Sequence, residues 1–347
     1  MKKLIIFGGS FDPIHKGHIE IAKRALNKIK ANKLIFVPCK NHPDKKILSA
    51  TDEQRYEMIK LAIANFPLFE ISRYEIDRKE ISYTIDTIYH IKDNYKDYQL
   101  YLLIGLDQLI TFENWNKYNE ILDNVKIICH PRKVDKTMIK NISFNYINLK
   151  SLNINTSSTE LRSKPNRKYL DSKVLKFIND KGIYARDRLS LMVSDYRLEH
   201  CLRVGKIAKE LAKSLKYYTL LDKAYVAGVY HDYAKEIPKE ECLKYARKLK
   251  IKKFISWKVL HGPIGAYLIN KNLLIDDYQV ITAVKNHVIP EDFSTLTKIV
   301  FCADKLDIRK DGEIENRKKL LELCKKDISA GFDAINVVLK KIYGDNQ

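Results

Sequence analysis

The hydrophobic pattern of this chain changes in character about halfway along. The first half contains short apolar runs rich in Ile, Leu, Val and Phe, which lie at 4–7, 34–39, 100–104 and 125–129. Such runs are typical of strands in a parallel sheet that is covered on both faces. The intervening and following stretches have a helical pattern at 52–64, 84–95 and 172–181. Strands that alternate with helices predict a doubly wound α/β domain.

Local signals support these helices and a domain boundary. Thr51 and Gln54 form a capping-box signature at the start of one predicted helix, and Gly182 is placed to end another. After about residue 186 the strand pattern disappears and the pattern is helical throughout. The sequence therefore predicts an α/β domain at 1–186, followed by an all-α domain at 187–347.

Composition narrows the class of protein. The chain has 347 residues, which is enough for two or three domains. It contains no run of about 18 apolar residues, so we expect no membrane-spanning helix. Its six cysteines are scattered without a C-x-x-C pair, which predicts a reduced, cytoplasmic protein. The net charge of +20 suits polyanions, but the lysines are spread along the chain, so we expect nucleotides rather than nucleic acid as partners.

The stretch GGSFDPIHKGH, from Gly8 to His18, joins the first apolar run to a helix. Glycines let the backbone approach a phosphate, and a helix N-terminus offers N–H groups and the positive end of its dipole. His15 and His18 share one face of the first helical turn. Two imidazoles at this position can donate hydrogen bonds to phosphates, which suits nucleotidyl transfer, because positioning and charge stabilisation do most of that catalysis. The candidate binding residues before them are Gly8, Gly9, Ser10 and Phe11.

Two further segments point to the same chemistry. The stretch NTSSTELR at 155–162 is a hydroxyl-rich helix start that ends in Arg162, which is suited to clasping phosphate oxygens. The stretch LIGLDQL at 103–109 places Gly105 and Asp107 at the end of a strand, where Asp107 can accept a hydrogen bond from a ribose hydroxyl. A pair of histidines alone would be weak evidence, whereas the combined set favours a nucleotide enzyme.

The motifs GGSFDPIHKGH and NTSSTELR resemble those of the H-x-G-H nucleotidyltransferase superfamily, which has a Rossmann-like fold. The segments VPCKNHPDK, RYEM, SYTIDTI and IGLDQLITFENW resemble, in this order, those of bacterial nicotinate-nucleotide adenylyltransferases. The resemblance covers about residues 1–186. It implies transfer of AMP from ATP to nicotinate mononucleotide, with Mg²⁺, to give nicotinate adenine dinucleotide for NAD synthesis and to release pyrophosphate.

The same resemblance implies roles for individual residues. Contacts with phosphates would come from His15, His18, Lys45, Ser157, Ser158 and Arg162. Contacts with the ribose and the nicotinate ring would come from Gly105, Asp107, Thr84 and Trp115. The chain departs from the family in two places. Asp44 replaces the His of a frequent Pro-His-Lys, and His130-Pro131-Arg132 replaces Arg-Pro-Gly, so that Arg132 is a nearby basic residue able to compensate.

Other enzymes share the first motif. Class I aminoacyl-tRNA synthetases carry an H-x-G-H type of motif, but NTSSTELR stands where their lysine-rich loop would be. Pantetheine-phosphate and cytidylyl transferases also carry it. The segments SYTIDTI and ENW favour the nicotinate enzyme over these alternatives.

The helical half contains a second set of candidate residues. These form the series H…HD…H…H…D, made of His200, His231, Asp232, His261, His287 and Asp304. Imidazole and carboxylate ligands suit a borderline divalent metal, and the lack of thiolates argues against a closed structural zinc site. Ligands spread over several helices are also typical of metal sites inside helical bundles.

This half resembles the HD-domain metal phosphohydrolases. The segments LEHCLRVGKIAKELA, HDYAKEIP, LHGPIGAYL, VKNH and FCADKLDIR resemble the YqeK type, over about residues 188–342. The resemblance implies symmetric hydrolysis of diadenosine tetraphosphate (Ap4A) to ADP. It also implies that the six residues hold one or two metals, iron or else manganese, with Asp232 central to catalysis. Lys235 is a candidate phosphate contact. The alternatives for this half are an HD nucleotidase, a signalling phosphodiesterase and a helical module without activity; the oligomeric state stays open.

Overall fold

The computed structural model divides into two compact units. It describes residues 1–40, 48–80, 82–131, 142–152, 156–307 and 316–344. Unit 1 comprises Met1–Arg162 and Asn166–Val174, and unit 2 comprises Ser163–Pro165 and Leu175–Gln347. Within the described residues, no helix combines the length and the apolarity needed to cross a bilayer.

Unit 1 is built on a parallel sheet. Its strands are β1 (Lys2–Gly9), β2 (Lys33–Pro38), β3 (Phe69–Ile71), β4 (Tyr98–Gly105), β5 (Val125–His130) and β6 (Tyr146–Asn148). Their order in the sheet is β3-β2-β1-β4-β5-β6, and every neighbouring pair is parallel. The chain proceeds from β1 outward to β3 and then returns to the other side of β1 with β4. The strand order therefore reverses between β1 and β4, and ligands of open α/β sheets bind at the carboxyl ends of the strands at such a point.

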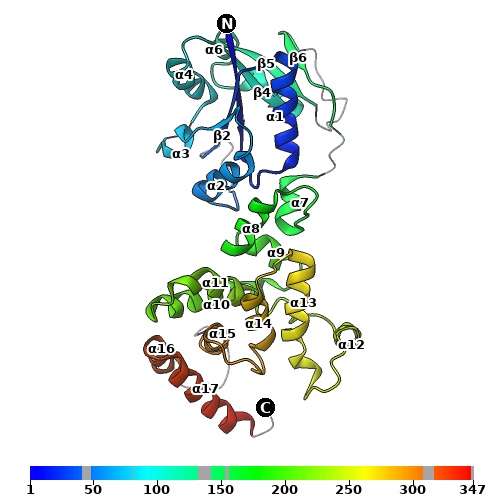
Figure 1. Cartoon of the computed structure of the whole chain (residues 1–347), viewed down its shortest axis with the longest axis vertical. Helices are drawn as coiled ribbons and strands as arrows, with labels where there is room; N and C mark the ends of the chain where they lie inside the picture. Colours follow the sequence, from blue (N-terminus) through cyan, green and yellow to red (C-terminus); the bar gives the residue numbers. More distant parts are fainter. Residues whose placement is uncertain (41–47, 81, 132–141, 153–155, 308–315, 345–347) are drawn as a thin grey trace. The chain divides into compact units, whose positions relative to one another are not determined.

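Helices cover both faces of this sheet (Figure 1). They are α1 (Lys16–Ile29), α2 (Asp52–Ile63), α3 (Tyr74–Asp77), α4 (Thr84–Asn94), α5 (Leu106–Ile110), the 3-10 helix η1 (Phe112–Asn114), α6 (Tyr118–Asn124) and α7 (Ser158–Ser163). On one face, Ile88 of α4 packs in a common core with Ile6 and Leu102 of the strands. The next strand residue, Phe7, is buried as well and points to the opposite face.

The α/β architecture predicted from the sequence is confirmed. The predicted capping box is present, since Gln54 N donates to Thr51 Oγ1 and Thr51 N donates to Gln54 Oε1. Gly182, which follows the helix over 172–181, has the left-handed φ of +62° that favours glycine at a helix end. The edge strands β3 and β6 are absent from the sequence prediction, because three residues are too few to establish a period.

The described residues of unit 2 form helices without strands, as predicted. The α-helices are α8 (Ser172–Lys181), whose first turn belongs to unit 1, α9 (Ala185–Leu189), α10 (Asp195–Ser214), α11 (Leu221–Tyr230), α12 (Lys239–Lys248), α13 (His261–Leu273), α14 (Tyr278–Asn286), α15 (Thr295–Lys305), α16 (Arg317–Lys326) and α17 (Ile328–Tyr343). Two 3-10 helices are η3 (Tyr218–Leu220) and η4 (Trp257–Val259). Their buried apolar side chains form one continuous core.

Residues 175–186, which the sequence analysis placed in the first domain, pack within unit 2. Nδ2 of Asn179 donates to the carbonyl oxygens of Leu273 and Leu274, at 3.2 and 2.9 Å. Its Oδ1 accepts from the buried guanidinium of Arg188, at 3.0 Å. These hydrogen bonds attach the end of α8 to the helical core.

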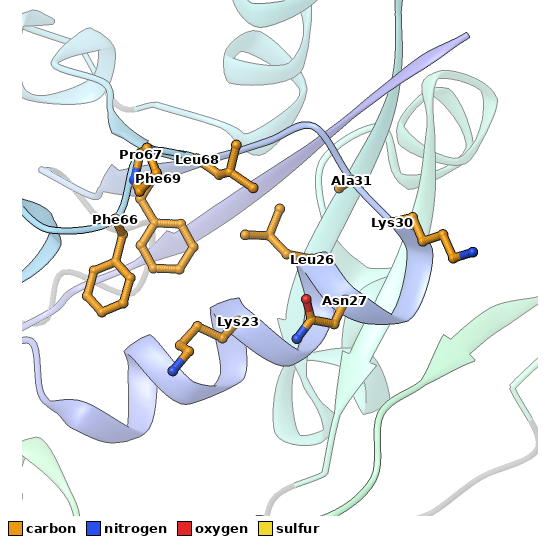
Figure 2. Close-up of a pocket in the computed structure, with 9 residues that line it drawn as sticks. All are labelled: Lys23, Leu26, Asn27, Lys30, Ala31, Phe66, Pro67, Leu68 and Phe69. Atoms are coloured by element: carbon orange, nitrogen blue, oxygen red, sulfur yellow. The ribbon is translucent and has the colours of Figure 1, made fainter.

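A hollow of about 630 Å³ lies on unit 1 between α1 and the segment before β3. Figure 2 shows Leu26, Phe66 and Phe69 around it. The residues that α1 contributes come from the last turns of that helix, whereas the paired histidines lie at its start. The hollow is therefore separate from the predicted nucleotide site.

Candidate functional sites

His15 and His18 lie side by side at the start of α1, with their ring centroids 3.8 Å apart. Nδ1 of His15 accepts from the N–H of Gly17 at 3.1 Å, and Nδ1 of His18 accepts from the N–H of His15 at 3.2 Å. A ring nitrogen that accepts a hydrogen bond carries no proton, so the neutral ring carries its proton on Nε2. The caps of this helix therefore set both imidazoles as Nε2–H donors.

The predicted second phosphate segment is attached directly to the histidine loop. Oγ of Ser158 donates to the carbonyl oxygen of Pro13 at 2.9 Å, and Arg162 donates to the carbonyl oxygen of Asp12 at 2.8 Å. Oγ of Ser157 accepts from the N–H of Glu160 at 3.2 Å and so caps the short helix α7. The two motifs, about 140 residues apart in the sequence, thus form one structural unit.

Two residues absent from the sequence prediction hold the histidine loop in place. The carboxylate of Asp12 accepts from the backbone N–H groups of residues 49–50, at 2.9 and 3.1 Å. Arg55 is fully buried and donates to the carbonyl oxygens of Ser10, at 2.8 Å, and Cys39. The segment RYEM contains Arg55, but its role depends on the tertiary fold, and no local pattern reveals it.

The glycines before the loop differ in their surroundings. A Cβ at Gly9 would lie 3.1 Å from the ring of Phe11, which itself packs edge-on against His18, with centroids 5.2 Å apart. Phe11 has a left-handed φ of +47°. A Cβ at Gly8 would meet no atom within 4 Å. Packing against Phe11 therefore explains why residue 9 is a glycine. The space beside Gly8 is open, as the close approach of a phosphate requires.

The residues predicted for the ribose and the nicotinate ring lie at the same edge of the sheet. Gly105 is the last residue of β4, and Asp107 follows in the first turn of α5. Thr84 begins α4, and Trp115 packs on Phe112 with ring centroids 5.1 Å apart. The Trp115 side chain adjoins the core that α4 forms on the sheet.

The histidines approach this edge from the opposite face of the sheet to α4. The ring of His18 packs near Phe7, whereas Ile6, the preceding residue of β1, points into the core that α4 covers. Two predicted residues, Lys45 and Arg132, lie outside the described residues, as does Asp44.

In unit 2 the structure brings all six predicted ligands together. The carboxylates lie at the centre, and every histidine directs Nε2 toward them. Oδ1 of Asp232 lies 3.1 Å from His261 and 3.5 Å from His287. Its Oδ2 lies 3.5 Å from His231 and 3.9 Å from His200. Asp304 completes the second group, with Oδ1 3.2 Å from His200 and 3.4 Å from His231. Asp232 therefore joins two groups of potential ligands.

Glycines at two helix crossings bring these residues together. A Cβ at Gly228 of α11 would lie 2.8 Å from the Cα of Gly205 of α10, so only glycines allow these helices to approach as they do. His200 and His231 lie near this crossing. A Cβ at Gly262 would lie 2.6 Å from the carbonyl oxygen of Lys285. This close approach brings the start of α13, where His261 lies, next to the end of α14, which His287 follows.

Hydrogen bonds at Nδ1 fix the orientation of all four rings. His231, His261 and His287 each place Nδ1 2.7 Å from a backbone carbonyl oxygen, those of Gly228, Lys258 and Val284 respectively. A carbonyl oxygen only accepts, so Nδ1 carries a proton, and in the neutral ring Nε2 presents its lone pair to the centre. Histidines that bind metals usually donate their other ring N–H to a carbonyl oxygen or a carboxylate in this way.

His200 differs from the other three histidines in its Nδ1 partner. Its Nδ1 lies 2.8 Å from the carboxylate of Asp307, which is buried. Arg203 donates to both oxygens of that carboxylate, at 2.8 to 3.1 Å. The sequence analysis did not include Asp307, although it lies three residues after Asp304 in FCADKLDIR.

The protonation states in the cluster match the needs of a metal. Burial lowers the pKa of His261, and it lowers that of His287 to about 3, so both rings are neutral. Although burial opposes ionisation, the surrounding histidines hold the pKa of Asp232 well below its usual range. Burial likewise opposes protonation of His231, yet Asp232 and Asp304 raise its pKa to about 9. The carboxylates thus favour positive charge between them, which a cation would supply.

The residues fit a divalent metal. Within the described part of the chain, Nε2 of His200 and Nε2 of His231 are buried and make no hydrogen bond. The donor atoms are imidazole nitrogens and carboxylate oxygens, which suit borderline divalent ions. The two groups that share Asp232 would hold one or two such ions.

Basic side chains surround this cluster. Arg197 lies 2.8 Å from Oδ2 of Asp232, and Nζ of Lys305 lies 2.6 Å from Oδ2 of Asp304. Nζ of Lys235, the predicted phosphate contact, lies 3.3 Å from Nε2 of His261, and burial lowers its pKa. The sequence analysis missed Arg197 and Lys305, although each is close to a predicted ligand in the sequence. Together they place basic groups beside the two carboxylates.

Known protein families match both halves of the chain. A cytidylyltransferase-like family model matches residues 6–164, and an HD domain model matches residues 197–309. A protein of Mycoplasma genitalium named "Probable nicotinate-nucleotide adenylyltransferase/Ap4A hydrolase" is 40% identical over 88% of this chain and 87% of its own length. A protein of the same name from Mycoplasma pneumoniae is 32% identical over 94% of this chain and 96% of its own.

Two solved structures are similar to parts of the chain. An adenylyltransferase for nicotinic acid mononucleotide from Plasmodium falciparum, complexed with NaAD, is 22% identical over 53% of this chain and 98% of its own, with a TM-score of 0.45. A protein from Clostridium acetobutylicum, described as a "predicted HD superfamily hydrolase", is 26% identical over 45% of this chain and 86% of its own, with a TM-score of 0.40. With its two matched domains and full-length relatives, the chain belongs to the nicotinate-nucleotide adenylyltransferase/Ap4A hydrolase family, in which a cytidylyltransferase-like domain precedes an HD domain.

Proposed function

We propose that unit 1 transfers AMP from ATP to nicotinate mononucleotide and releases pyrophosphate. The observation that carries this proposal is the pair of histidines at the start of α1. Their Nδ1 atoms accept backbone N–H groups, so each neutral ring offers an Nε2–H donor. The pair follows β1, where the strand order of the sheet reverses. The names of the relatives supply the acceptor. Mg²⁺ bound with ATP would neutralise part of the phosphate charge.

The residues of unit 1 act in this proposal by positioning and by donating hydrogen bonds. His15 and His18 donate to the phosphate oxygens, on which negative charge develops as the bond to the leaving pyrophosphate breaks. Donors that are already oriented cost no reorganisation at that moment. Ser158 and Arg162, through their bonds to Pro13 and Asp12, keep the loop that carries these histidines in one conformation.

A comparison of acceptors tests this assignment. The purified chain, supplied with ATP and Mg²⁺, is offered nicotinate mononucleotide, nicotinamide mononucleotide and phosphopantetheine in parallel. Nicotinate mononucleotide should have the highest kcat/KM, because a site lined by donors penalises a group that cannot accept in the same way. Higher kcat/KM with either of the other two acceptors would contradict the assignment.

We propose that unit 2 hydrolyses Ap4A symmetrically to two molecules of ADP, with one or two divalent ions, iron or manganese, held by the six-residue cluster. The carrying observation is that the two oxygens of Asp232 face different groups of histidines. When bound, such ions supply Lewis acidity and lower the pKa of a coordinated water. Arg197, Lys235 and Lys305 would offset the charge of the polyphosphate and orient it.

Metal and product analysis test the second assignment. We expect the purified, unchelated chain to contain a transition metal and to release only ADP from Ap4A. Release of AMP and ATP would mean attack at another phosphorus atom and a different type of hydrolase. A chain that holds no metal, and that hydrolyses nothing when supplied with iron or manganese, would instead be a helical module. We also propose a cytoplasmic location, because the six cysteines are all free thiols.

A further inference from the structure

A cavity of about 430 Å³ in unit 2 is lined partly by residues that flank two of the candidate ligands in the sequence. Its wall includes Leu260, the residue before His261, and Asn286 and Val288, the residues on either side of His287. His261 and His287 are the two ligands that face Oδ1 of Asp232. The chain segments that carry these two ligands therefore also form part of the cavity wall.

The outer wall of the cavity is apolar yet open to solvent. Phe254, Ile255 and Ile289 line it and are 40%, 63% and 37% exposed. Apolar side chains that gather in solvent around a concave surface mark a binding site more often than a chance arrangement. The volume falls within the range of small-molecule sites. A phenylalanine ring in such a wall offers a face on which a nucleobase can stack.

The charge around the cavity also fits a nucleotide. Lys253, Lys285 and Glu291 belong to its wall, where Lys285 pairs with Glu291 at 3.5 Å, so that Lys253 supplies the net positive charge. Lys235 lies at the cluster beside His261. A ligand that occupies both places needs an anionic part for the cluster and a flat apolar part for the cavity. A nucleotide combines these two parts in one molecule, whereas an apolar peptide segment has no group for the cluster.

We propose that this cavity binds the base and ribose of one nucleoside of the polyphosphate substrate, with the base stacked on Phe254, while the phosphates extend to the cluster. The inference rests on the proposed hydrolase function of unit 2 and adds the site that selects a nucleotide over inorganic polyphosphate. The apolar cavity wall contributes affinity for the nucleoside, and the cluster with its basic neighbours contributes affinity for the phosphates.

Fluorescence of a single tryptophan measures this binding without any need for turnover. The chain has two tryptophans. The substitution Trp115→Phe removes the one in unit 1, and the other, Trp257, lies between Ile255 and Val259 of the cavity wall. ADP is titrated into the manganese-loaded protein with and without Phe254→Ala. Loss of one base–aromatic stack should weaken ADP binding about tenfold. Inorganic pyrophosphate, which lacks a base, should displace ADP with the same inhibition constant from both proteins.

A matched control is Phe293→Ala, which removes a phenylalanine that is 60% exposed and lies outside the cavity wall. Phe293→Ala should leave the affinity for ADP and the inhibition constant of pyrophosphate unchanged. The inference is overturned if Phe254→Ala binds ADP as tightly as its parent, or if it loses affinity for pyrophosphate to the same extent. If the Phe254→Ala effect is found but the chain forms no ADP from Ap4A, the hydrolase proposal fails while the nucleoside site stands.

Discussion

The partner of Nδ1 decides what each functional histidine can do. At the start of α1, Nδ1 of His15 and of His18 accepts a backbone N–H, so Nε2 is a donor for phosphate oxygens. In unit 2, Nδ1 of His231 faces a carbonyl oxygen, and the same holds for His261 and His287, so Nε2 is a lone-pair donor for a metal. One side chain thus serves two kinds of chemistry, according to its hydrogen bond to the protein.

The loss of one phosphate donor should slow adenylyl transfer. His18→Ala removes an Nε2–H that is already oriented, so kcat should fall roughly 10²-fold or more, the scale seen for lost transition-state donors. The fold should persist, since the lost cap costs about 1 kcal/mol. His90→Ala is the matched control, because His90 is exposed and stacks on Tyr74. A folded His18→Ala protein with the parent kcat would contradict the role given to this residue.

The carboxylate of Asp307 should strengthen the metal site through His200. Asp307→Asn keeps an acceptor for Nδ1 of His200 but removes the negative charge, so the affinity for a divalent ion should fall about 10- to 100-fold. Competition with a chelator measures this affinity directly. Asp222→Asn is the control, since Asp222 is a carboxylate that forms ion pairs with two lysines, Lys181 and Lys209. Equal affinities in the parent and Asp307→Asn would rule out the proposed effect.

At the scale of elements, short connections between helices and the sheet build the site of unit 1. The helix α2 places Arg55 beneath the histidine loop, and α7 holds the loop from the other side through Ser158 and Arg162. Next to them, α3 and α4 are joined by a hydrogen bond from Thr87 to the carboxylate of Glu75, at 2.7 Å.

The contact between α3 and α4 should make unit 1 sensitive to pH. Burial raises the pKa of Glu75 to about 7, so the folded state binds this proton more tightly than the unfolded chain. Its stabilising effect is full at pH 4 and is lost as the pH rises through about 7. Glu75→Gln stays neutral, so relative to the parent it should gain roughly 2 kcal/mol between pH 5 and pH 8.

Urea unfolding followed by Trp115 fluorescence, in a Trp257→Phe background, measures this difference in the free energy of unfolding. The control is Glu80→Gln, which changes a side chain that is 86% exposed. A stability difference between Glu75→Gln and its parent that does not vary with pH would contradict the shifted pKa.

The sequence predicted the elements more fully than the contacts between them. Strands β1, β2, β4 and β5 were predicted from apolar runs, and the two histidine sets from their spacing. Asp12, Arg55 and Asp307 were missed because each acts through partners that only the tertiary fold brings near. The glycine pair at 205 and 228 likewise carries no local signal, since its function is the close approach of two helices.

At the scale of the whole molecule, the two candidate sites are built from separate sets of residues. The paired histidines and their supporting residues belong to unit 1, and the six-residue cluster belongs to unit 2. Among the residues that the structure describes, none of those assigned above belongs to both sites. Substitutions in one cluster should therefore leave the chemistry of the other intact.

The most direct test of this account is the measurement of both activities in one preparation of each of three proteins: the parent, Asp232→Ala and His18→Ala. Asp232 faces four histidines, so Asp232→Ala should lose bound metal and release no ADP from Ap4A, yet form nicotinate adenine dinucleotide at the parent rate. His18→Ala should show the reverse, with its metal content and hydrolysis unchanged. If Asp232→Ala keeps its metal and hydrolyses Ap4A normally, or if either substitution abolishes both activities in a folded protein, the account of two separate nucleotide enzymes is contradicted.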